Sequence, residues 1–90
     1  MDLTTLPGGD LIADGLADLE QGRDTSAAFL VSIGAPRLRT LGYAARRTLL
    51  DPERRLYELL AQTEPGSAHG RYNALVRRLV SFERAAACAR

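Results

Sequence analysis

The sequence predicts an all-α protein, a compact bundle of four to five helices that ends in a long amphipathic C-terminal helix. Three observations predict this fold class. Apolar residues in the last third of the chain recur with the period of a helix. Glycine, proline and capping residues divide the rest into short helical segments. The run Ser26–Ile33 would also suit a buried strand, but no second strand-like segment exists to pair with it.

Ninety residues predict one domain, 1–90, whose core is large enough to fold but marginal, with 1–8 expected to be a flexible N-terminal segment. The net charge of +1 gives no global attraction to nucleic acid or to an anionic membrane. The N-terminus lacks the basic start and apolar run of a signal peptide, and a single cysteine suits a reducing compartment. All 12 basic residues are arginine, which is typical of GC-rich bacterial codon usage, so we expect a bacterial cytoplasmic protein.

The first helix is expected over Gly9–Gln21, followed by Gly22 as a left-handed stop. Its inward face carries three apolar residues, Ile12, Leu16 and Leu19. Its outward face carries acids at four-residue spacing, Asp10, Asp14 and Asp18. One helix seldom supplies enough oxygen ligands for a cation, so this ladder is interpreted as a solvated face and no metal site is expected.

The second helix, Ser26–Ile33, can be capped by Asp24 or Thr25. It is apolar nearly all round, which predicts a position in the middle of the bundle. Gly34 is expected to end it, and Pro36 is well placed as the first residue of a third helix that runs to about Leu41. Residues 43–50 fit either a continued helix or a loop.

The sequence Asp51-Pro52-Glu53 is a strong helix start, with an aspartate cap, a proline at the first position and an acid in the first turn. The helix is expected to run to about Gln62 and to carry an exposed Arg54–Glu58 pair. Its inward residues are Leu56, Leu59 and Leu60. Residues 63–66 then break the helix, and Ser67 can cap the last one.

The last helix has a broad apolar face, which predicts packing against two or three other helices. That face comprises Ala68, Tyr72, Leu75, Leu79, Phe82 and Ala86, widened by Val76 and Val80. The candidate interaction surface comprises Arg71, Asn73, Arg77, Arg78 and Arg84. Arginine suits planar carboxylate or phosphate recognition. Acidic segments 1–20 and 51–70 alternate with basic segments 21–50 and 71–90, which predicts pairing between them across the fold.

No catalytic constellation is apparent within one chain, so we expect neither an enzyme nor a bound cofactor. His69 is the only histidine, and a multi-histidine metal site is thereby excluded within one chain. A helix N-terminus disfavours the imidazolium, so His69 is interpreted as neutral, partly buried and structural. The alternative role, a general base, would need a nucleophile or substrate from another chain. Cys88 lies far from any helix N-terminus that would lower the pKa of its thiol.

The class that fits best is a protein–protein interaction or accessory module. Its partner is either another protein or a second copy of the chain. A symmetric homodimer is expected, because ninety residues are expected to supply too few other helices to cover a helix that is apolar on all sides. No membrane partner is expected.

The alternative is a helix-turn-helix-like DNA-binding regulator or antitoxin-type protein. Thr25–Leu41 has the outline of that motif and would place Arg37, Arg39 and Thr40 on the DNA. A proline in the turn, a short second helix and the bulky Leu30 at a crowded position all weaken the match, as does the lack of a basic excess.

Overall fold

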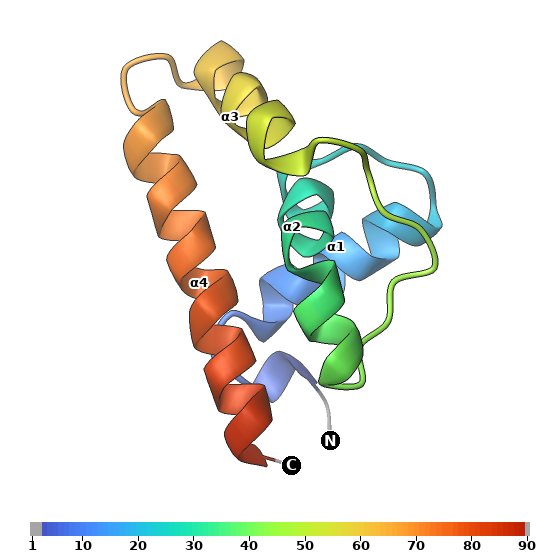
Figure 1. Ribbon diagram of the computed structural model, residues 1–90. Helices are drawn as coiled ribbons and strands as arrows, with labels where there is room; N and C mark the ends of the chain where they lie inside the picture. Colours follow the sequence, from blue (N-terminus) through green and yellow to red (C-terminus); the bar gives the residue numbers. More distant parts are fainter. Residues whose placement is uncertain (1–2, 90) are drawn as a thin grey trace.

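The centre of the fold is a single helix, α2 (Ser26–Thr40), with the other helices packed around it (Figure 1). The computed structural model describes residues 3–89. Around α2 lie the 3-10 helix η1 (Leu3–Thr5), α1 (Gly9–Glu20), α3 (Pro52–Thr63) and α4 (Ala68–Ala89). The predicted all-α bundle is confirmed, with four α-helices in the described residues and the longest of them last.

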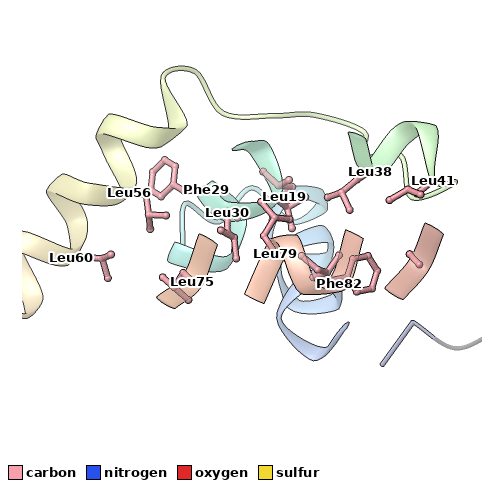
Figure 2. Packing of buried hydrophobic residues seen from close by; sticks show 14 of the residues in the cluster. Leu19, Phe29, Leu30, Leu38, Leu41, Leu56, Leu60, Leu75, Leu79 and Phe82 are labelled. Atoms are coloured by element: carbon pink, nitrogen blue, oxygen red, sulfur yellow. The ribbon is translucent and has the colours of Figure 1, made fainter. Parts of the chain in front are cut away.

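The apolar run of α2 is buried on every side, as the sequence predicts. Residues 28–32 are all buried, and they meet inward side chains from the three other α-helices (Figure 2). The largest of those partners are Ile12 and Leu19 of α1, Leu56 and Leu60 of α3, and Leu75, Leu79 and Phe82 of α4. Because one chain supplies this cover, α2 needs no second subunit to bury its apolar surface, and the reason for expecting a dimer is removed.

The predicted break at Gly34 is wrong, because α2 continues through Pro36 to Thr40. Gly34 permits a close approach to α4, since a Cβ there would lie 2.8 Å from Cδ1 of Leu79. An interior proline costs about 3 kcal/mol. The continuous helix keeps Leu38 and Leu41 on the buried face of Leu30, and burying each leucine contributes roughly 1.5–3 kcal/mol. Packing thus offsets the cost of the proline.

Both glycine stops that flank the central helices have the hydrogen bonds of a Schellman motif. After α1, the N–H of Arg23 donates to the carbonyl of Asp18 at 2.8 Å, and Gly22 has a φ of 78°. After α2, the N–H of Tyr43 donates to the carbonyl of Leu38 at 2.8 Å. These turns satisfy carbonyls that would otherwise lack a partner at each helix end, and Gly22 acts as the sequence predicts.

Residues 43–50, for which the sequence left two interpretations open, are a loop that runs back along α2 (Figure 1). The buried Ser32 fastens it, because its hydroxyl accepts from the N–H of Leu49 at 3.0 Å and donates to the carbonyl of Ala28 at 2.9 Å. Tyr43 adds an edge-on contact with Phe82, with 5.4 Å between ring centroids. The loop therefore joins α2 and α4 rather than leaving the body.

The remaining predicted helix starts are confirmed, with one difference at α3. Asp51 precedes α3 in a left-handed conformation, with a φ of 51°, and its carboxylate binds Arg54 instead of capping a backbone N–H. The expected Arg54–Glu58 pair is present at 3.3 Å. Ser67 precedes α4, and its carbonyl accepts the N–H of Arg71 at 2.9 Å.

The N-terminal segment, expected to be flexible, packs against the body over its described residues 3–8. Leu3 and Leu6 contact the core. Gly8 has a φ of 74°, and a Cβ on it would lie 2.7 Å from the carbonyl oxygen of Arg78. A Cβ on Gly9 would overlap the carbonyl of Leu3. Gly8 thus lets the start of α1 lie close to α4, and Gly9 lets η1 pack against the start of α1.

The helices α1 and α2 approach each other closely at Gly15, in the middle of α1. A Cβ there would overlap the carbonyl oxygen of Ala27 and Cγ2 of Val31, and would lie 2.9 Å from the carbonyl carbon of Ala27. The obstacle is backbone, which cannot rotate away as a side chain can. Gly15 therefore sets the distance between α1 and α2.

Gly15→Ala should lower the free energy of unfolding by roughly 2–3 kcal/mol, because α1 must move off α2. A domain of this size has on the order of 5–13 kcal/mol in total, so the loss is large. Gly70→Ala is the matched control, since Gly70 is helical and a Cβ there meets open space. It should raise stability by about 0.5–1 kcal/mol. Urea unfolding of both variants measures the difference, and equal effects would contradict the close-packed crossing.

Candidate functional site

A groove of about 420 Å³ lies between α1, the start of α2 and α4. It lies between two helices that both pack against α2, and alanines from both α1 and α4 line it. Its apolar lining comprises Leu11, Ala17, Ala27, Ala74 and Leu75. Ala17 and Ala74 are exposed, so the groove opens to solvent. Its charged lining comprises Asp14, Asp18, Arg23, Arg71 and Arg78.

Asp18 anchors one end of the groove through a network that also begins α2. Its carboxylate accepts hydrogen bonds from the hydroxyl of Thr25 and from Arg23. The distance from Nη2 of Arg23 to Oδ1 of Asp18 is 2.8 Å. Thr25 in turn caps α2 by accepting from the N–H of Ala28 at 3.1 Å. The hydrogen bonds from Thr25 and Arg23 hold the pKa of the Asp18 carboxyl below its usual value. Of the two predicted capping residues, Thr25 is the one that caps.

The two groove-lining arginines of α4 are held by acids outside the groove. Arg78 binds Asp10 of α1 at 2.9 Å, and Arg71 binds Glu64 of the preceding turn at 3.2 Å. The Arg78–Asp10 pair confirms the prediction that arginines of the last helix meet acids of the first. Both side chains of this pair are well exposed, so it contributes at most about 1 kcal/mol to stability.

Asp14 differs from the other charged residues that line the groove. It lies on α1 between Asp10 and Asp18 and is exposed. Its side chain forms no hydrogen bond or ion pair with any residue in the range 3–89. The acidic ladder predicted from the sequence therefore has paired ends and an unpaired middle. Asp14 is a carboxylate that faces the groove with its charge uncompensated.

The predicted interaction surface of α4 is divided between two sides of the helix. Arg71 and Arg78 line the groove, whereas Asn73, Arg77 and Arg84 lie on the outer face. Within residues 3–89, neither Arg77 nor Arg84 forms an ion pair. The structure thus brings two of the five predicted residues into a concave site and leaves three on a convex, solvated surface.

The prediction that His69 is partly buried is wrong, because its side chain is exposed at the start of α4. The start of α4 lies at the end of the molecule where α3 turns into α4 (Figure 1). Its Nε2 lies 3.2 Å from Nδ2 of Asn73, and its ring meets Tyr57 of α3 edge-on at 6.4 Å. The ring of Tyr57 also packs against that of Tyr72, with 5.8 Å between the ring centroids. These contacts join α3 to α4 and offer His69 no nucleophile.

The helix-turn-helix interpretation requires a break between two helices before Arg37. Instead, Arg37, Arg39 and Thr40 lie at the C-terminal end of one continuous helix, α2. All three are exposed, and the two arginines complement the negative end of the α2 dipole. The Thr40 hydroxyl donates to the carbonyl of Pro36 at 3.2 Å. Burial raises the pKa of the nearby Glu83 carboxyl of α4, which the charge of Arg37 partly opposes.

Sequence reasoning missed the groove, the loop anchor Ser32 and the Asp18–Thr25 contact. A groove between α1 and α4 depends on how two helices diverge, which no local pattern reports. The one available signal was the set of alanines at exposed helix positions, Ala17 and Ala74, where polar residues would be ordinary.

No protein-family model, curated protein or solved structure matches this chain. In the described residues, no group of three or more histidine, cysteine, aspartate or glutamate side chains is arranged to hold a metal ion. None of the helices within residues 3–89 combines the length and apolar character needed to cross a membrane.

Asp18→Asn should lower the free energy of unfolding at neutral pH by about 1 kcal/mol, because it weakens a charge-assisted network. The folded pKa of Asp18 is lowered, so its stabilisation is present above the unfolded pKa and is lost as pH falls through the folded pKa. The gap between wild type and Asp18→Asn should therefore close in acid. Asp14→Asn is the control and should change stability by less than about 0.5 kcal/mol. Thermal or urea unfolding from neutral pH downward tests this, and a gap independent of pH would contradict it.

Proposed function

We propose that this chain is a cytoplasmic protein-interaction module that binds a segment of another protein in the groove between α1 and α4. The observation that carries the proposal is the groove itself, an open hollow of about 420 Å³ with an apolar floor and charged residues at its rims. Apolar surface provides affinity, and placed charges provide orientation and specificity.

The shape of the groove favours a chain segment over a small molecule. Arg71 and Arg78 are seven residues apart on α4, so that rim extends about 10 Å along the helix. Ala17 of α1 and Ala74 of α4 both line the groove and are exposed. A small-molecule site normally encloses most of its ligand, whereas a groove open along its length can accept a segment that enters at one end and leaves at the other.

The outer face of α4 supports this choice indirectly. Arg77 and Arg84 are exposed and do not line the groove, and exposed charges of that kind contribute little affinity by themselves. Interface energy is concentrated in desolvated pockets. The groove therefore supplies the stronger candidate contact, with the outer arginines at its periphery.

Site-specific photo-crosslinking tests this proposal. A benzophenone amino acid at Ala74, inside the groove, should form a discrete protein adduct in cells of the source organism. The same probe at Ala87, exposed on α4 but outside the groove, should not. Ala17→Trp, which fills the groove from the opposite helix, should abolish the Ala74 adduct. Adducts of equal yield from both positions, or an adduct that survives Ala17→Trp, would refute the groove as the binding site.

DNA binding is the second function class, and we expect it to fail in a direct measurement. At about 50 mM salt, the wild type should bind mixed-sequence duplex only weakly, because α2 is continuous through Arg37 and Arg39 and the net charge is small. Fluorescence anisotropy measures this, with Arg37→Ala/Arg39→Ala compared against Arg77→Ala/Arg84→Ala. A tight, salt-sensitive complex that only the first pair of changes removes would establish the DNA-binding alternative.

A further inference from the structure

We infer that the segment bound in the groove carries a lysine or arginine side chain that pairs with Asp14, beside an apolar side chain seated between α1 and α4. This inference rests on the proposed function and adds the chemistry of the partner. It is carried by a difference in charge pairing. The arginines that line the groove have carboxylate partners within the chain, whereas no described residue pairs with Asp14.

The arginines of the groove already have carboxylate partners within the chain. Arg78 binds Asp10 at 2.9 Å, Arg71 binds Glu64 at 3.2 Å, and Arg23 binds Asp18 at 2.8 Å. An acidic segment would have to compete with these pairs for each guanidinium. The acquired contact would then replace an existing one, and the gain in affinity would be small.

Asp14 offers a basic segment a contact without such competition. It is the middle acid of α1, and its neighbours Asp10 and Asp18 are each occupied by an arginine. No described residue binds Asp14. A cation placed there gains an ion pair and breaks none, so charge complementarity selects a basic residue at this point of the groove.

The register of α1 places the apolar contact beside that charge. Leu11, Asp14 and Ala17 are spaced three residues apart, so they follow one another along the same side of the helix, and all three line the groove. Across the opening stands Ala74 of α4. An apolar side chain that fills the space between Ala17 and Ala74 would bring a neighbouring basic residue within reach of Asp14.

Selection of random short peptides displayed on phage against the full chain tests the inference. The selected peptides should combine an apolar residue with a lysine or arginine. Their dissociation constants, measured by fluorescence anisotropy, should rise about five- to tenfold with Asp14→Asn. Glu20→Gln is the matched control, because Glu20 is an exposed acid of the same helix that does not line the groove, and it should leave the constants unchanged.

The remaining variants separate failure of this inference from failure of the proposed function. If Ala74→Trp abolishes peptide binding but Asp14→Asn does not weaken it, or if the selected peptides are acidic, the groove remains the binding site and the inferred partner chemistry is wrong. If Ala74→Trp has no effect, or no peptide is selected, both are wrong. A charge swap completes the test. A peptide whose lysine or arginine is replaced by glutamate should bind the Asp14→Arg variant. A purely structural role of Asp14 would not produce this rescue.

Discussion

The contact between Gly15 of α1 and the backbone of α2 at Ala27 is the constraint on which the other helix positions depend. A backbone-on-backbone approach is possible only where one residue has no side chain, and here the space beyond the Cα is already occupied by the Ala27 carbonyl and by Val31. On α1, Asp10 pairs with Arg78 of α4, and Asp14 and Asp18 line the groove. The groove lies between this side of α1 and α4.

Side-chain hydrogen bonds of Thr25 and Ser32 fix two segments outside the apolar core. Thr25 both caps α2 and donates to Asp18, so the start of one helix is tied to the end of another. Ser32 is buried in the middle of α2 and supplies an acceptor to the loop at Leu49. Each of these groups has its hydrogen bonds satisfied, as buried polar groups must if they are to stabilise the fold.

The two exposed alanines that line the groove affect both the stability of the bundle and the shape of the groove. Ala17 and Ala74 bury little surface and leave the groove open, which gives up part of the packing energy that larger residues would contribute. The ion pair between Arg78 and Asp10 connects α1 to α4 where they diverge. On α1, Asp10 and Asp18 form ion pairs that connect segments of the fold, whereas no described residue pairs with Asp14, the carboxylate to which we assign partner binding.

The sequence by itself determined the helical class, most helix ends and the faces of the helices, because these depend on local chemistry. Gly22 and Gly42 take left-handed conformations that other residues rarely adopt, and α3 and α4 begin directly after Asp51 and Ser67, where the sequence predicts helix starts. The 3.6-residue period also identified the buried side of α4, including Leu75, Leu79 and Phe82.

Tertiary structure alone decided the features that depend on residues far apart in the chain. Local propensity favours a break at Gly34–Pro36, but the approach of Leu79 and the burial of Leu38 keep α2 continuous. The exposure of His69 reflects its place at the end of the bundle. The groove, and the difference between Asp14 and its paired neighbours, appear only when α1 and α4 are placed around α2, because side chains at positions 10 and 78 must meet before position 14 can be the one left without a partner.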